Sequence, residues 1–251
     1  RKKRRKHLAS EISRERRVEF EFRLLISDLQ GDAALSDYKG AFHDKLAAVQ
    51  LMYSLCKAAT EKLQKVALEE SKESKVVMKE MGHYRAIAAA YLEAFLYFIM
   101  GAFDVLASIT LYLYPKDQKA LSKRYFKDQM NNFLQSNIDR DYAKLLSNNK
   151  DWIDDVSENR DALAHKASAF LGFDKGRVVF VKRKPYDEPF GKKPSMDLLA
   201  FLDSTYKNIY DFLESYVKIH RIRIPESQLS KMMLNQLKKG LIKEHVQKDQ
   251  N

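Results

Sequence analysis

The chain is poor in glycine, proline and cysteine, and each shortage excludes a class of fold or site. Only 8 Gly and 5 Pro occur among 251 residues. These are too few turn-forming residues for a many-stranded sandwich or barrel, so we expect long helices. Cys56 is the single cysteine. It excludes an intrachain disulfide, a cysteine-based zinc cluster and an iron–sulfur site, and it is typical of a reducing, cytoplasmic compartment.

Motifs for cofactors and for common hydrolases are also missing. The glycines form neither a dinucleotide-binding fingerprint nor a phosphate-binding loop, and no G-x-S-x-G or H-E-x-x-H motif occurs. The six histidines are scattered along the chain, which is atypical of a local metal site. We therefore expect neither a metal nor an organic cofactor. Because the first residue is not Met, we expect the chain to be part of a longer protein.

The excess positive charge lies at the two ends of the chain. The net charge is +11, from 45 Lys+Arg and 34 Asp+Glu. Residues 1–23 hold ten Lys/Arg and four Glu, residues 218–251 hold eight Lys/Arg and three acids, and residues 24–217 are neutral. Basic ends attract polyanions such as RNA. The alternative is that they only keep a helical protein soluble.

Two helices are expected in the first third of the chain. Residues 8–30 predict a charged helix that ends at Gly31. A longer helix begins at about Ser36, and its apolar residues recur in alternating steps of four and three, which predicts packing along one long partner helix. This heptad seam consists of Phe42, Leu46, Val49, Tyr53, Cys56, Thr60, Leu63 and Ala67. The polar residues 69–75 predict either an exposed helical segment or a break.

Residues 84–114 form the most apolar stretch, which is long enough to cross a membrane. Glu93 and Asp104 argue against a membrane, because each would cost about 2.5–3.5 kcal/mol at its centre. These acids lie close to three helical turns apart, so they share one face of the helix. We therefore expect no membrane, and we interpret this segment as the central helix of a bundle that presents its acids to an internal polar site.

Shorter helices are expected in the next part of the chain. Residues 116–136 and 139–146 predict helices, and 148–150 predicts a turn. Asp151 is expected to cap a helix that continues to about Leu171.

One strand and two further helices complete the prediction. Residues 177–182 alternate and are β-branched, which predicts a strand within a hairpin at about 176–194. Ser195 is expected to cap a helix over 196–221, and Pro225 to begin the last helix.

These elements predict an all-α fold with one short β-hairpin and long flanking helices. We divide the chain into a basic N-terminal helix (1–31), a long helix with the heptad seam (32–82), a helical bundle (83–221) and a basic C-terminal helix (222–251).

The strongest chemical signal is an arginine and a histidine five residues apart, Arg160 and His165. A polar residue, Asp161, stands next to the arginine. An arginine holds a phosphate through two hydrogen bonds at fixed charge, and a histidine moves a proton near neutral pH. Together they suit cleavage of RNA without a metal.

This segment resembles the HEPN superfamily of all-α ribonucleases and nucleotide-binding domains, whose signature is Arg, four to six residues, then His. Arg160 and His165 match that spacing, Asp161 stands where Asn is commonest, and Trp152 fits the helix that usually precedes the motif. The resemblance covers about residues 84–221. It implies a HEPN-like helical bundle and a metal-independent endoribonuclease that acts in defence against foreign nucleic acid or as a toxin. It also implies a homodimer with two Arg/His pairs across one groove, and an antitoxin or regulatory partner.

The resemblance also suggests roles for individual residues. Arg160 is expected to orient the scissile phosphate and His165 to act as general acid and base. Asp161 belongs to the motif, and Glu93 or Asp104 is expected to hold the pair from the neighbouring helix. Further basic residues are expected to follow the RNA backbone: Lys166, Arg177, Lys182, Arg183 and Lys184.

Three alternatives remain open at this point. Arg160 pairs with Glu93 or Asp104 for structural reasons only, and His165 caps a core contact. The fold is a non-catalytic module whose basic ends bind nucleic acid or an acidic partner. The protein is a helical interaction protein built around the heptad seam. For a homodimer, the apolar surface is expected from the seam and from a stripe of Met232, Met233 and Leu237, unless both pack within one chain.

Overall fold

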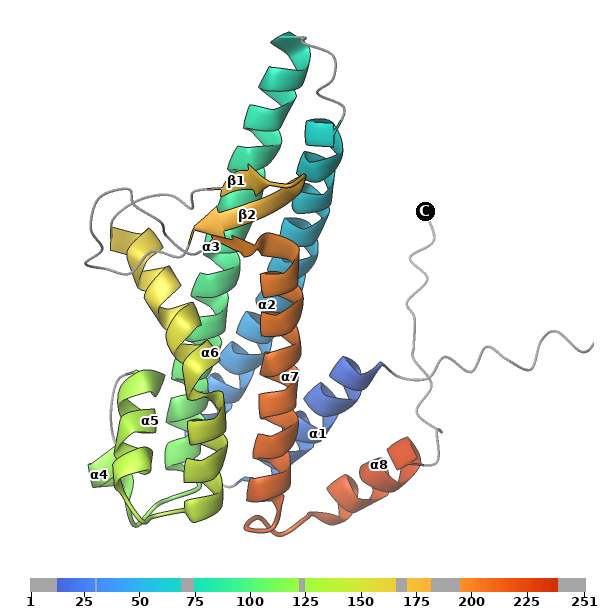
Figure 1. The fold of residues 1–251 in the computed structure, drawn as a ribbon. Helices are drawn as coiled ribbons and strands as arrows, with labels where there is room; N and C mark the ends of the chain where they lie inside the picture. The colour runs from blue at the N-terminus through green and yellow to red at the C-terminus, as the bar shows by residue number, and fades with distance from the viewer. Residues whose placement is uncertain are drawn as a thin grey trace, which may run out of the picture.

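Two long antiparallel helices form the centre of the computed structural model, α2 (Ala33–Leu68) and α3 (Lys75–Leu111) (Figure 1). The structure describes residues 13–29, 31–68, 75–121, 125–165, 171–181 and 195–238. The described residues are mainly helical with one small sheet, so the prediction of an all-α fold with a short β element is confirmed.

The heptad seam of α2 is buried within the chain. Its contact with α3 is the most extensive between any two elements, which confirms the prediction of one long partner helix. Six of its members are fully buried: Phe42, Leu46, Val49, Cys56, Thr60 and Leu63. Tyr53 stacks on Tyr206 of α7 (Leu198–Arg221), with ring centroids 4.1 Å apart. The expectation that the seam offers a surface to a second chain is therefore wrong.

The apolar helix α3 lies in the core and begins about nine residues earlier than predicted. Within the described residues it contains one segment, Met78–Leu111, that is long and apolar enough to cross a membrane by length and composition. In its most apolar window, 56% of the residues are buried inside the protein. Core helices of globular proteins pass the same test.

The N-terminal helix α1 (Arg14–Asp28) packs against α7, and α8 (Gln228–Lys238) lies beside it. Ser13 caps α1 by accepting a hydrogen bond from the backbone N–H of Arg16. At the other end of α1, the buried Asp28 pairs with Arg221 at 2.7 Å and accepts a hydrogen bond from the Ser230 hydroxyl. One carboxylate thus joins three helices.

The prediction of one continuous helix over 116–136 is wrong. The structure has a single turn, α4 (Gln118–Leu121), and then α5 (Phe126–Gln135). Tyr125 has an extended backbone at the start of α5, and its side chain is exposed.

The two helices predicted on either side of residues 148–150 form one continuous helix, α6 (Arg140–His165). Asn149 donates to the Leu145 carbonyl at 2.8 Å and accepts from the Trp152 indole at 2.7 Å. These side-chain bonds satisfy the polar residues inside the helix, so no turn forms. The cap is Asp139, whose Oδ1 accepts from the Tyr142 N–H at 3.0 Å, and not Asp151.

A three-stranded antiparallel sheet packs against α2 and α7, in the order β1 (Leu171–Asp174), β2 (Arg177–Val181) and β3 (Ser195–Asp197). Strand β2 confirms the predicted strand. Strand β1 was not predicted, and it begins at Leu171, where the preceding helix was expected to end. Asp197 and not Ser195 caps α7, because its Oδ1 accepts from the Ala200 N–H.

The last helix, α8, begins three residues after Pro225, and the Ser227 hydroxyl accepts from the Ser230 N–H at its start. Several predictions lie outside the described residues: the basic segment 1–12, the polar segment 69–74, the loop 182–194 and the chain after Lys238.

Candidate functional site

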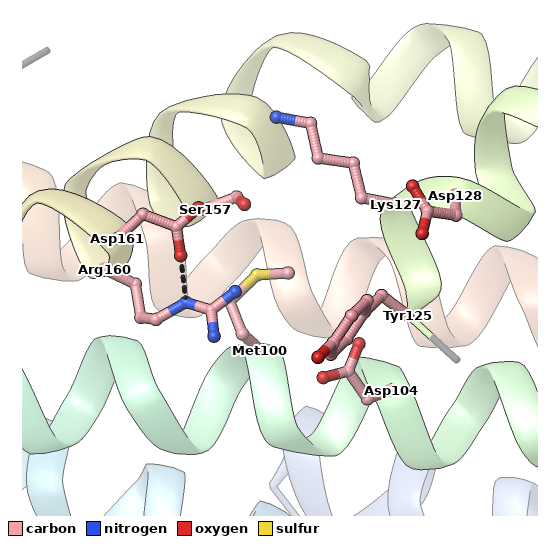
Figure 2. Close-up of a pocket in the computed structure, with 8 residues that line it drawn as sticks. All are labelled: Met100, Asp104, Tyr125, Lys127, Asp128, Ser157, Arg160 and Asp161. Carbon is pink, nitrogen blue, oxygen red and sulfur yellow. Dashed lines mark ion pairs between the residues drawn. The ribbon is translucent and has the colours of Figure 1, made fainter. Parts of the chain in front are cut away.

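Arg160 lies in the last turns of α6 and lines an open pocket between α3, α5 and α6 (Figure 2). The pocket has a volume of about 280 Å³. Met100 and the ring of Tyr125 supply apolar surface, and the other lining residues are charged or polar. The lining residues are Met100, Asp104, Tyr125, Lys127, Asp128, Ser157, Arg160 and Asp161. The sequence prediction named three of these residues, Arg160, Asp161 and Asp104.

Asp104 lines the pocket and also binds the first residue of α5. Its Oδ1 accepts a hydrogen bond from the backbone N–H of Phe126 at 2.9 Å. The cap residue Tyr125 makes no such bond with its own side chain, so a carboxylate from α3 supplies the N-terminal cap that α5 lacks locally. Burial raises the pKa of Asp104, while this backbone bond and the charges of Arg160 and Lys45 oppose the rise.

The guanidinium of Arg160 is held on one side by the next residue. Its Nε lies 2.9 Å from Oδ1 of Asp161, as the dashed line in Figure 2 shows. The buried Nε–H nevertheless has no hydrogen-bond partner with acceptable geometry. The contact is thus an ion pair between neighbours on one helix, and the two terminal nitrogens of the guanidinium remain on the pocket side.

Lys127 is the second cation of the pocket, and it is also paired. Its Nζ lies 3.0 Å from Oδ1 of Asp154 on α6, and Lys150 binds the other oxygen of that carboxylate. The five charged residues that line the pocket are three acids and two cations. The pocket itself therefore carries a formal charge of −1, in contrast to the basic ends of the chain.

Asp104 and Arg160 line the same pocket, but Glu93 does not line it. Glu93 lies 11 residues earlier in α3, which is about 16 Å along the helix, and it is not among the residues that line the pocket. Of the two acids predicted to support the Arg/His pair, only Asp104 occupies the expected position.

His165 is the last residue of α6. Its Cα lies about 7.5 Å further along the axis than that of Arg160, and about 140° around it. The side chain of His165 lies outside the described part of the structure, as do Lys166, Lys182, Arg183 and Lys184. Arg177, on β2, is exposed and lies 3.6 Å from Asp197.

Several lining residues were missed by the sequence prediction. Met100 precedes Asp104 by one helical turn and Ser157 precedes Arg160 by three residues, so helical spacing was a usable signal for both. Tyr125, Lys127 and Asp128 reach the pocket because α5 begins beside Asp104. No local pattern encodes that contact.

A second buried polar cluster lies at the start of α6. Asp139 accepts a hydrogen bond from the Tyr114 hydroxyl, and its Oδ2 lies 2.7 Å from a guanidinium nitrogen of Arg223. His220 is fully buried beside Tyr114 and Tyr142, with ring centroids 5.8 Å and 4.9 Å from its own. Burial lowers the pKa of His220 to about 3, so this histidine is neutral in the fold.

Among the described residues, no three His, Cys, Asp or Glu side chains are grouped closely enough to hold a metal ion. Comparisons with protein-family models, with curated proteins and with solved structures found no match to this chain.

Proposed function

We propose that the chain is a metal-independent endoribonuclease of the HEPN type that acts in defence or as a toxin. The observation that carries the proposal is the position of Arg160. Its guanidinium lines an open pocket on the helix that ends, five residues later, with His165. The arginine would bind and orient the scissile phosphate, and the histidine would transfer protons.

The proposed reaction is an in-line transfer at phosphorus. The ribose 2′-oxygen attacks the phosphate as its proton passes to a base, and the 5′-oxygen leaves as it takes up a proton. The products are a 2′,3′-cyclic phosphate and a free 5′-hydroxyl. His165 supplies the acid–base group, Arg160 stabilises the negative charge on the non-bridging phosphate oxygens, and Asp104 supports Arg160 from α3.

A homodimer fits this reaction better than one chain. The helical offset between Arg160 and His165 separates their Cα atoms by about 140° around α6, so groups from two copies would serve the attacking and the leaving oxygens more directly. Arg177 on β2 and Lys166, Lys182, Arg183 and Lys184 would follow the RNA backbone. An antitoxin or other regulatory partner would restrain the activity.

The direct test is incubation of the whole chain with single-stranded RNA in excess EDTA. We expect cleavage that leaves 2′,3′-cyclic phosphate ends and that falls about 10²–10⁴-fold in His165→Ala. Arg160→Lys should also be impaired, because a lysine loses the two-pronged contact with phosphate. The matched control is His83→Ala, which removes an exposed histidine on α3. Cleavage that requires a metal ion, or that survives His165→Ala, contradicts the proposal.

One observation favours a second candidate, a non-catalytic RNA-binding module. The ion pair between Arg160 and Asp161 engages the arginine inside the chain, and an aspartate there is a departure from the commonest family residue. This module would bind RNA without cleaving it, with an affinity that falls steeply as salt rises. Absence of RNA binding at low salt would remove both candidates and leave a helical interaction protein.

A further inference from the structure

The acidic character of the Arg160 pocket needs an explanation that phosphate binding does not give. Asp104, Asp128 and Asp161 outnumber the two cations, and both cations already have carboxylate partners. The net charge of such a pocket opposes a phosphate group, so Arg160 alone would have to hold one there. A neutral group that presents N–H donors would be attracted, because ionised carboxylates only accept hydrogen bonds.

Asp104 is the acceptor best placed for such a group. Its Oδ1 is fixed by the N–H of Phe126, and this bond also fixes the orientation of the whole carboxylate. An ionised carboxylate can accept several hydrogen bonds, and Figure 2 shows that of Asp104 beside Tyr125 in the pocket. The pocket thus contains a positioned carboxylate that can accept a further hydrogen bond.

Two side chains offer flat or adaptable apolar surface next to this acceptor. Tyr125 is 45% exposed and lines the pocket, and Met100 lines it from α3. Nucleobases stack on aromatic rings whatever their sequence. A volume of about 280 Å³ lies near the lower end of the roughly 300–1,000 Å³ of small-molecule sites, which suits one nucleotide and not a duplex.

We propose that this pocket binds a guanine base of the RNA, with its N–H edge on Asp104, its ring against Tyr125 and its phosphate on the terminal nitrogens of Arg160. Guanine presents two neighbouring donors, N1–H and the N2 amino group. Adenine and cytosine place a ring-nitrogen acceptor beside their amino group, and uracil flanks its single N–H with carbonyls, so a carboxylate repels part of each edge. The proposal rests on the proposed function for its phosphate contact only.

The test uses the four 5′-mononucleotides, GMP, AMP, CMP and UMP, titrated into the whole chain and followed by NMR chemical shifts. We expect GMP to bind at least tenfold more tightly than the others, as is typical of one well-formed base contact. Equal affinities for the four nucleotides, or no binding of any of them, would overturn the proposal.

Asp104→Asn is the decisive variant. Its amide oxygen can still accept from the Phe126 N–H, so the cap of α5 is kept, while its NH₂ group replaces Oδ2 and presents a donor to the pocket. We expect GMP affinity to fall at least tenfold with an unchanged melting temperature. Asp151→Asn, an exposed aspartate on α6, is the charge-matched control and should bind GMP like the original chain. A preference for GMP that persists in Asp104→Asn would overturn the proposal.

The experiments can contradict the guanine site and the endoribonuclease independently of each other. RNA cleavage with no preference for GMP would overturn the guanine site and leave the endoribonuclease. Selective GMP binding that is lost in Asp104→Asn, without RNA cleavage, would support the guanine site and contradict the endoribonuclease.

Discussion

His220 shows how one buried side chain can set the response of the whole fold to acid. It is fully buried, and its pKa is lowered to about 3, chiefly by burial, with Asp139 opposing and Arg223 adding to the effect. Below the ordinary histidine pKa of about 6.5 the unfolded chain takes up a proton that the folded chain does not. The stabilisation is therefore present above pH 6.5 and is lost as the pH falls towards 3.

We expect the free energy of unfolding to decrease by up to about 1.4 kcal/mol per pH unit between pH 6 and pH 4 because of this one residue. His220→Phe should flatten the profile in that window, since phenylalanine cannot bind a proton. Urea unfolding at pH 7, 5.5 and 4.5 measures the effect, and His83→Phe, at an exposed position on α3, is the control. An identical slope in His220→Phe and in the original chain would show that other groups control acid unfolding.

A second prediction at the scale of single residues concerns the contribution of Asp104 to the stability of the fold. Asp104→Ala removes the acceptor of the Phe126 N–H at the start of α5, and loss of a helix cap costs about 0.5–2 kcal/mol. Asp104→Asn should stay close to the original chain, because its amide oxygen makes the same bond. Thermal unfolding of the two variants distinguishes them, and equal losses would mean that the charge of Asp104 matters more than the cap.

At the scale of single elements, the β1–β2 hairpin depends on its two-residue turn. Lys175 and Gly176 both have positive φ, 48° and 78°, as a type I′ turn requires. A Cβ on Gly176 would find ordinary contact distance to Leu68, so Gly176→Ala should be destabilising through backbone strain, by about 1 kcal/mol. Lys175→Asn should stabilise by a few tenths, because Asn adopts this conformation readily. Melting temperatures that shift in the same direction would contradict this explanation.

The elements that the sequence predicted correctly are those with a periodic apolar pattern. The seam from Phe42 to Ala67 repeats over several turns, and that pattern predicted a long partner helix. It did not say whether the partner lies in the same chain, and the structure shows that it is α3. The errors lie where polar side chains satisfy one another. Asn149 bonds within α6 and prevents a break, although Asn, Asn and Lys in a row are typical of a turn. The Lys175–Gly176 pair was a usable signal for a hairpin and hence for β1, but the prediction assigned no strand before it.

The candidate site was predictable only where it follows one helix. Arg160, Asp161 and Ser157 share the end of α6, and Met100 and Asp104 share a face of α3. The approach of α5 to Asp104 is a tertiary contact, so Tyr125 and Lys127 could not be identified from spacing.

At the scale of the whole molecule, the surfaces left for self-association differ from those expected. The seam is buried within the chain. The Met232 stripe lies on α8, which contacts α1 and is on the other side of α7 from α6 in Figure 1. A dimer through α8 would keep the two Arg160 pockets apart. Tyr97 is 59% exposed and precedes Met100 by three residues on α3, so it lies on the side of α3 that faces the pocket.

We therefore expect a homodimer whose interface includes Tyr97 and brings two α6 helices together across one groove. Light scattering at micromolar concentration should report about twice 29.3 kDa. Tyr97→Asp should give a monomer and abolish RNA cleavage, because a charge would be buried in the interface. Leu229→Asp, at an exposed position on α8, is the matched control and should remain a cleaving dimer. If Leu229→Asp is the variant that dissociates, the dimer forms through α8. If a monomer still cleaves RNA, one Arg/His pair is sufficient and the composite groove is not needed.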